Sequence, residues 1–159
     1  MYVGPQAFLF EMPFSATSER PGTGWEHFPH IADIGVRGFG STVAASFEQT
    51  ALALTAVIAD LESIRPEESV KVRCEAPNVE LLLVDWLNAI VYEMSIRKML
   101  FCEFHVNIDG EILHGQAHGE KISVSRHRPA SEVKGATLSE LEVAQSPEGI
   151  WHAQCIVDV

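Results

Sequence analysis

Basic side chains are scarce in this sequence: 11 Lys and Arg stand against 22 Asp and Glu, and the formal net charge is -11 over 159 residues. A protein that binds nucleic acid over a large area needs clustered Lys and Arg to neutralise phosphates. The composition therefore argues against a large direct nucleic-acid surface. The excess of carboxylates suits a cation or a basic protein partner, although solubility alone is the more common explanation.

Cysteines and long apolar runs are also few. Cys74, Cys102 and Cys155 show no CxxC spacing and form an odd count. This indicates a reducing compartment and argues against a disulfide framework or a thiolate metal site. The first 14 residues, MYVGPQAFLFEMPF, lack a basic region and carry an apolar run too short and interrupted for a signal or a membrane span. We predict a cytoplasmic protein without membrane contact.

A single domain is predicted for residues 24–159, preceded by an arm. Residues 1–23 mix Pro, Gly, Ser and Thr without periodicity, and we expect this arm to be loose or disordered. The remaining length is enough to bury one hydrophobic core.

Two helices and several short strands are predicted along this domain. Apolar residues repeat at three-to-four spacing from Val43 to Ile58, and Ser41 or Thr42 can cap this helix. A second helix, apolar around most of its circumference, begins after its expected cap, Asn78. Alternation predicts strands at 25–28, 34–39 and 69–76, and hairpins follow in the C-terminal half. The order predicts an α+β fold: a two-layer sandwich with a largely antiparallel or mixed sheet and both helices packed on one face.

The dipeptide Asp109-Gly110 lies between two alternating runs and predicts a hairpin. As the central residues of a type I′ turn, they would pair Val106 with Leu113 and place His105 opposite His114. A cross-strand histidine pair can bind zinc. Exposed histidines on the wet face of an antiparallel sheet are the alternative, and we favour it.

The stretch WEHFPHIADIGVRGFG, residues 25–40, concentrates groups that can carry chemistry. It holds His27, His30 and Asp33 between two strand-like pieces. Loops carried by a rigid scaffold supply a large share of functional residues. A plain polar turn would contain the same residues.

Five motifs occur in a fixed order over residues 25–159, and in them the chain resembles the archease family. The motifs are HIADIGVRGFG, STVAASFEQTALAL, LLLVDWLNAIVYE, RHRPASEVKGATL and the terminal IVDV. The chain departs from the family pattern at Ile31, where the family usually has Thr.

The resemblance implies a non-catalytic activator of an RtcB-type tRNA-splicing RNA ligase, which promotes guanylylation of the ligase and its multiple turnover. Contact with tRNA and guanine nucleotide would then be indirect, through the ligase. The resemblance also implies a divalent cation site, calcium in the family. Its ligands would be Asp33, Asp158 and the terminal residue Val159, and oxygen donors of this kind suit Ca²⁺. Lys134, in the EVK motif, is the expected contact with the ligase or its nucleotide, together with His30 and His127.

Two other functions remain open. One is a stand-alone metal-dependent hydrolase that uses His30 as general base near a cation held by Asp33. Zinc is the less favoured metal, for which His30 beside Asp33 would supply a nitrogen ligand. No further acidic pair, nucleophile motif or Gly-rich phosphate cradle is visible for such an enzyme. The third candidate is a chaperone-like binder of RNA-modifying enzymes that uses the Phe-rich arm as its contact.

Overall fold

The computed structural model describes residues 15–17 and 22–159. The loose arm expected at 1–23 falls largely outside these residues. Within it, β1 (Ser15–Thr17) pairs antiparallel with β2 (Gly24–His30). In the part of the chain that the structure describes, no helix is both long and apolar enough to cross a membrane.

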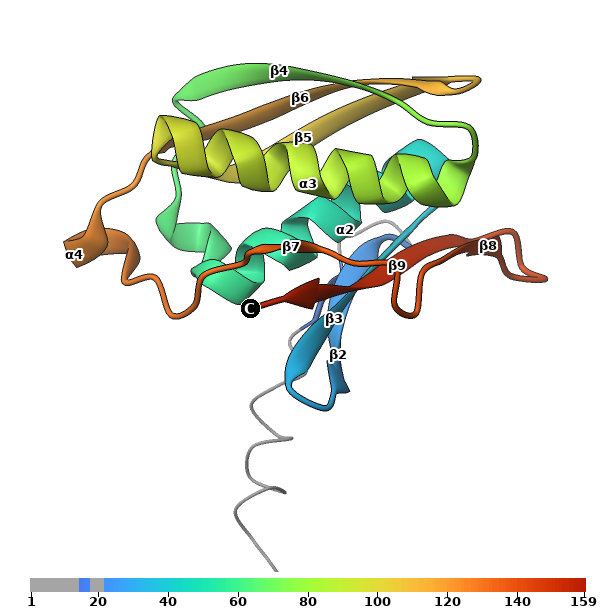
Figure 1. Ribbon diagram of the computed structural model, residues 1–159, viewed down its shortest axis with the longest axis horizontal. Helices are drawn as coiled ribbons and strands as arrows, with labels where there is room; N and C mark the ends of the chain where they lie inside the picture. Colours follow the sequence, from blue (N-terminus) through green and yellow to red (C-terminus); the bar gives the residue numbers. More distant parts are fainter. Residues whose placement is uncertain (1–14, 18–21) are drawn as a thin grey trace, which may run out of the picture.

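The strands form two antiparallel sheets (Figure 1). The large sheet has the order β1-β2-β3-β9-β7, with β8 also paired to β9, and the small sheet has the order β4-β6-β5. The other strands are β3 (Asp33–Gly40), β4 (Glu68–Glu75), β5 (Met99–Asp109), β6 (Ile112–Lys121), β7 (Gly135–Ala136), β8 (Glu142–Gln145) and β9 (Trp151–Asp158). The predicted α+β class and the antiparallel pairing are confirmed, and the strands divide between two sheets.

Both predicted long helices are present, and polar caps start them. In α2 (Val43–Ile58), the Oγ1 of Thr42 accepts a hydrogen bond from the amide of Ala45 at 3.0 Å. In α3 (Val79–Arg97), the Oδ1 of Asn78 accepts one from the amide of Leu81 at 2.9 Å. The caps were predicted from residue type alone because the interaction is local.

The two helices join the sheets into one core. Helix α2 contacts β2, β3 and β9 of the large sheet and β5 of the small one, whereas α3 contacts all three strands of the small sheet as well as β7 and β8. Trp86 of α3 is fully buried, and its indole Nε1 donates to the carbonyl of Phe47 in α2 at 3.1 Å. A Cβ added to Gly115 of β6 would lie 2.3 Å from the Trp86 ring, so only glycine fits beneath this indole.

Two short helices were not predicted from the sequence. One turn of 3₁₀ helix, η1 (Leu61–Ser63), follows α2. A one-turn helix, α4 (Val124–His127), follows β6. These elements are too short for the periodicity of the sequence to reveal.

The predicted register of the β5–β6 hairpin is wrong. Asp109 pairs with Ile112, so the two central turn residues are Gly110 and Glu111. Gly110 has a φ of +62°, the left-handed conformation required at the first central position of such a turn. The observed partner of each residue lies two positions from the predicted one. Because two positions along a strand return to the same face, His105 and His114 still share one face of the sheet.

Candidate functional site

The two aspartates predicted as cation ligands lie at the same end of the large sheet. Strands β3 and β9 pair antiparallel, with Ile34 opposite Val157. Asp33 directly precedes Ile34 and Asp158 directly follows Val157, so the register continued by one residue sets the two aspartates opposite each other. The Cβ atoms of opposite residues in an antiparallel pair are about 5 Å apart. Two acids from the two ends of the domain are thereby brought together.

His30 extends this arrangement to a third strand. It pairs with Asp33 across the β2–β3 hairpin, and Gly135 of β7 pairs with Asp158 on the far side. Opposite residues in an antiparallel sheet present their side chains on one face. We call His30, Asp33 and Asp158 the acid row. Asp158 is exposed, and the other two side chains are half-buried.

Alternation places the acid row on the outer face of the large sheet. His27, Val36 and Cys155 lie three positions along the same strands from His30, Asp33 and Asp158. They are likewise opposite one another, and they are buried against α2. The Nε2 of His27 lies 2.7 Å from the carbonyl oxygen of Ala53 in α2. Since three positions reverse the face of a strand, the acid row points away from the helices.

An arginine on the same outer face is engaged elsewhere. Arg37 forms an ion pair with Glu26, and its Nε donates to the Oε1 of Gln154 at 2.8 Å. Its guanidinium lies 4.3 Å above the centroid of the Phe28 ring. Arg37 is four positions from Asp33, a distance of about 13 Å along the strand. Arg37 is thus held away from the acid row and does not neutralise it.

The predicted His/Asp loop is a tight turn, because both strands continue to its edge. Only Ile31 and Ala32 lie between the paired residues His30 and Asp33. Ile31 is fully exposed and has a φ of +35°. A β-branched side chain is strained at positive φ. The Nδ1 of His30 is buried and has no hydrogen-bond partner among the described residues.

Lys134 is held beside the acid row by its backbone. Its amide donates to the carbonyl oxygen of Asp158 at 2.7 Å, and its side chain is exposed. Two residues later, the amide of Ala136 donates to the Oδ1 of Asn88 at 2.8 Å, which ties this segment to α3. The side chain of Val159 packs against the core and fixes the end of β9.

His127, the other predicted contact residue, lies apart from the acid row and is buried. The amide of Ser123 donates to its Nδ1 at 2.8 Å, so the ring proton is on Nε2, which donates to Glu120 at 2.9 Å. Both ring nitrogens are therefore used within the chain. Contact between His127 and a partner stays a prediction, and it would require this network to open.

Glu120 is the centre of this network, and sequence reasoning missed it. Its carboxylate accepts hydrogen bonds from both terminal nitrogens of Arg126, at 2.7 and 2.8 Å, and from the amide of Arg65 at 2.9 Å. The hydrogen bonds from Arg126, with those from Arg65 and His127, lower the pKa of Glu120 to about 2. Nothing in the sequence separates this carboxylate from the exposed ones, because its partners come from two other segments, α4 and the chain around Arg65.

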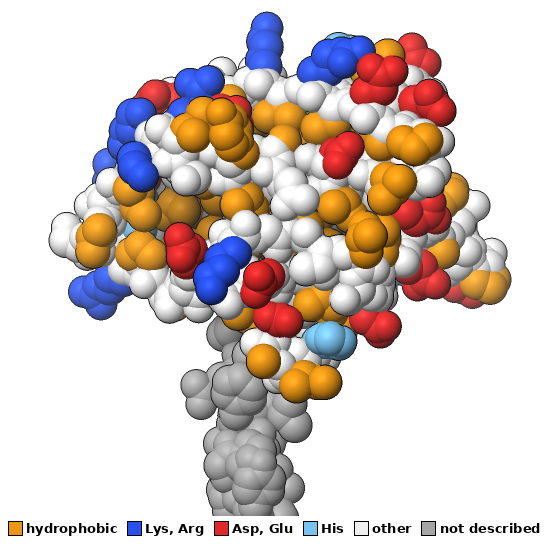
Figure 2. Space-filling view, viewed as in Figure 1, with side chains coloured by type: hydrophobic (Ala, Val, Ile, Leu, Met, Phe, Trp, Pro, Cys, Tyr) orange, Lys and Arg blue, Asp and Glu red, His pale blue; other side chains and the backbone are white. Residues whose placement is uncertain are grey.

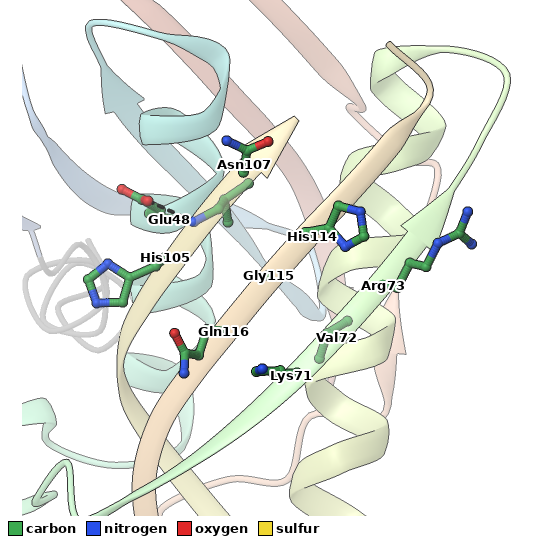
Figure 3. Close-up of a pocket in the computed structure, with 10 residues that line it drawn as sticks. Glu48, Lys71, Val72, Arg73, His105, Asn107, His114, Gly115 and Gln116 are labelled. Carbon is green, nitrogen blue, oxygen red and sulfur yellow. Dashed lines mark hydrogen bonds between the residues drawn. The ribbon is translucent and has the colours of Figure 1, made fainter. Parts of the chain in front are cut away.

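The outer face of the small sheet carries a pocket of about 650 Å³, to which no function is assigned (Figure 3). Lys71, Arg73, His105, His114 and Gln116 are among the residues that line it. The predicted pairing of His105 with His114 is wrong: His105 lies opposite Gln116, and His114 opposite Asn107. The ring nearest to His105 is that of His118, at a centroid distance of 5.2 Å.

The donor atoms at the acid row suit a hard cation. In the described part of the chain, no three His, Cys, Asp or Glu side chains lie close enough to hold a metal. The acid row offers two carboxylates, to which main-chain oxygens can add, and Ca²⁺ prefers oxygen ligands of this kind. Burial raises the pKa of Cys74 and Cys102 to about 11 and that of Cys155 to about 12, so all three thiols are protonated at neutral pH.

The fold and the site define a class: a two-sheet α+β domain in which a pair of aspartates meets at one sheet end. Residues 25–159 match the model of the Archease protein family (MTH1598/TM1083), and the chain belongs to this family. The resemblance found in the sequence is confirmed.

Individual relatives agree with the family match. "Protein archease" of Pyrococcus furiosus is 38% identical over 139 residues, which cover 85% of this chain and 98% of the relative. "Protein archease" of Methanosarcina barkeri is 35% identical over 143 residues, 87% of this chain and 97% of the relative. The solution structure of Methanobacterium thermoautotrophicum protein 1598 superposes with a TM-score of 0.72 at 29% identity, over 85% of this chain and 98% of that one.

Proposed function

We propose that this protein is a non-catalytic activator of an RtcB-type tRNA-splicing RNA ligase and promotes the guanylylation and multiple turnover of that enzyme. Membership of the archease family supports the proposal. The observation that carries it is the convergence of Asp33, Asp158 and Lys134 at one end of the large sheet. A cytoplasmic location is part of the same proposal, in keeping with three free cysteines.

The acid row is the proposed cation site, with Asp33, Asp158 and the carboxyl group of Val159 as ligands. Two facing carboxylates repel each other, and a divalent cation between them would offset this repulsion and stiffen the ends of β3 and β9. Calcium is the favoured metal because the available donors are oxygens. His30 then serves as a positioning neighbour of Asp33, with which it pairs in the register.

Lys134 is the proposed contact with the ligase or with its guanine nucleotide. Its exposed ammonium suits a phosphate or a carboxylate, for which lysine acts as a compact point charge. The hydrogen bond from its amide to Asp158 couples its position to the strand that carries the acid row. Contact with tRNA would be made by the ligase, since the chain carries a large negative charge.

Transfer of a radiolabelled guanylate onto the cognate ligase tests the proposal. The wild-type protein should stimulate transfer, and Asp33→Asn and Lys134→Ala should each reduce the stimulation at least tenfold, the effect of about 1.4 kcal/mol of lost interaction. Asp85→Asn, an exposed aspartate on α3, and Lys71→Ala, an exposed lysine on β4, are the matched controls and should stimulate normally. Normal stimulation by both site variants would show that the assigned site is wrong.

One observation favours the second candidate, a stand-alone metal-dependent hydrolase. The Nδ1 of His30, beside Asp33, has no described hydrogen-bond partner and so has the capacity to accept a proton. Nucleotide or phosphoester turnover by this protein without any ligase, lost in His30→Asn, would support the hydrolase. If there is neither turnover nor stimulation, the chaperone-like binder remains.

A further inference from the structure

The few basic side chains of the chain are concentrated at one end of the molecule. Seven of the eleven Lys and Arg residues belong to segments that meet where α3 and β6 end and α4 begins: Arg65, Arg97, Lys98, Lys121, Arg126, Arg128 and Lys134. Figure 2 shows Lys and Arg gathered on the side where α3 ends and α4 lies, whereas Asp and Glu prevail on the opposite side. A strongly acidic chain thus has one basic end.

Hydrogen bonds hold these segments together. The Nζ of Lys121 donates to the carbonyl of Arg97 at 2.9 Å, and the amide of Ile122 donates to the carbonyl of Lys98 at 2.8 Å. The amide of Ala130 donates to the last residue of α2, the carbonyl of Ile58, also at 2.8 Å. The basic end is therefore a connected part of the fold.

Part of this positive charge is uncompensated. Arg97 is paired with Glu93, and Arg126 with Glu120. The other five cations at this end are exposed, and their side chains form no ion pair with a residue in the described ranges 15–17 and 22–159; these are Arg65, Lys98, Lys121, Arg128 and Lys134.

Exposed apolar side chains mark the same end. Six large apolar side chains are exposed in the described part of the chain, and four of them lie here: Tyr92, Ile96, Ile122 and Val124. Tyr92 and Ile96 are four residues apart and adjacent on α3. Val124 is 73% exposed at the first position of α4. Apolar side chains that cluster beside charges indicate a contact surface.

A groove of about 480 Å³ lies at the same end, and Ile122 is the one of these four side chains that lines it. We call it the basic groove. Its lining includes Val91 and Met94 of α3 together with Lys98 and Lys134, and one acid, Glu132. The groove thus combines an apolar wall with two ammonium groups and a single carboxylate. Through Lys134 it adjoins Asp158 at the acid row.

We propose that the basic groove docks an acidic amphipathic segment of a partner protein. Bulky apolar side chains of the segment enter the groove against Met94 and Ile122, and its carboxylates lie beside Lys98 and Lys134. Complementary charge gives the contact its specificity and steers the encounter, and burial of apolar area stabilises it. The inference holds whichever enzyme this protein serves.

A single-stranded nucleic acid fits the same surface less well. Such strands bind through cations combined with aromatic platforms for their bases. Of the four exposed apolar side chains at this end, only Tyr92 is aromatic, and the groove is walled by aliphatic and methionine side chains. The surface therefore favours a peptide.

Fluorescence anisotropy on the full chain tests the proposal with three labelled probes. The first is a peptide of about 16 residues in which Leu and Glu recur at helical spacing, and the second is the same peptide with Lys in place of Glu. The third is an oligouridylate of about 12 nucleotides. We expect the acidic peptide to bind, with an affinity that falls as salt rises, and the basic peptide not to bind.

Two variants locate the contact. Lys98→Glu reverses a charge in the groove, and Ile122→Ser with Val124→Ser removes apolar surface in and beside it; each should weaken peptide binding about tenfold, equivalent to about 1.4 kcal/mol. Lys71→Glu, on β4 away from the groove, is the matched control and should bind as the wild type does. Thermal unfolding verifies that each variant is folded. If the double variant is unfolded, Lys98→Glu alone tests the contact.

Three results would overturn the inference: no binding of the acidic peptide up to about 1 mM, equal binding of both peptides, or tighter binding of the oligouridylate. Guanylylation of the ligase is a separate readout, because Lys98→Glu leaves the acid row unchanged. Failure of the peptide experiment would therefore leave the proposed function standing. Failure of the guanylate-transfer experiment would likewise leave the proposed peptide contact standing.

Discussion

The amide of Lys134 donates a hydrogen bond of 2.7 Å to the carbonyl oxygen of Asp158. This contact pairs the start of β7 with the end of β9, and it fixes the backbone of Lys134, whose side chain is exposed, beside one of two facing aspartates. A cation site and a partner contact at this sheet end are consequently not independent, since both depend on the same strand pairing.

Asn88→Ala should loosen the segment that positions Lys134. The variant removes the Oδ1 that accepts from the amide of Ala136, and the loss should lower the free energy of unfolding by about 1 kcal/mol. Stimulation of the ligase should fall as well, while Asn107→Ala, an exposed amide on β5, should change neither quantity. Urea unfolding and the guanylate-transfer assay measure the two effects. Unchanged stimulation would show that β7 need not be anchored to α3.

Calcium should stabilise the wild-type protein. Ligand that binds only the folded state raises the free energy of unfolding, by about 2.7 kcal/mol at one hundred times the dissociation constant. Asp33→Asn and Asp158→Asn should lose most of this gain, and Asp85→Asn should keep it. Thermal unfolding in calcium and in chelator provides the measurement. An equal shift in all four proteins would place the cation elsewhere.

Residues appended after Val159 should weaken calcium binding if its carboxyl group is a ligand. The extension converts a charged carboxylate into a neutral amide carbonyl, a poorer ligand for a hard cation. The same residues appended before Met1 serve as the control. Calorimetric titration of both extended proteins with Ca²⁺ compares the affinities, and equal affinities would remove Val159 from the site.

Acid should destabilise the protein through Glu120. Its folded-state pKa of about 2 lies below the ordinary value of 4.5, so its ionised form stabilises the fold above pH 4.5, and this contribution is lost as pH falls toward 2. Glu120→Gln should be less stable than the wild type at neutral pH, with a smaller further loss between pH 4.5 and 2. Urea midpoints over this range test the slope. Parallel profiles for both proteins would contradict the assignment.

Ile31→Gly should stabilise the β2–β3 hairpin. A β-branched residue in the left-handed region costs about 1–2 kcal/mol, and relief of this strain exceeds the added entropy of glycine in the unfolded chain. A net gain of about 0.5 kcal/mol is expected. Ile31→Val keeps both the branching and the φ of +35°, so its stability should match the wild type in urea unfolding. Equal stability of the glycine variant would mean that the turn is unstrained.

Local features of this fold could be predicted from the sequence because they depend on near neighbours. The caps at Thr42 and Asn78, the periodicity of both long helices and the existence of the Asp109-Gly110 hairpin all follow from residues a few positions apart. The register of that hairpin was missed because either Asp109 or Gly110 can open the turn, and only the observed φ of Gly110 distinguishes the two.

The candidate site shows the same difference between local and long-range features. The sequence by itself determined which chemical groups are present: carboxylates at Asp33 and Asp158, an ammonium at Lys134 and a net negative charge. Only the tertiary structure decided that β3 and β9 are neighbours in one sheet, that Glu120 is buried among cations, and that seven basic residues share one end. These relations join segments far apart in the chain, and such pairings are set by the packing of the whole domain, which no local pattern records.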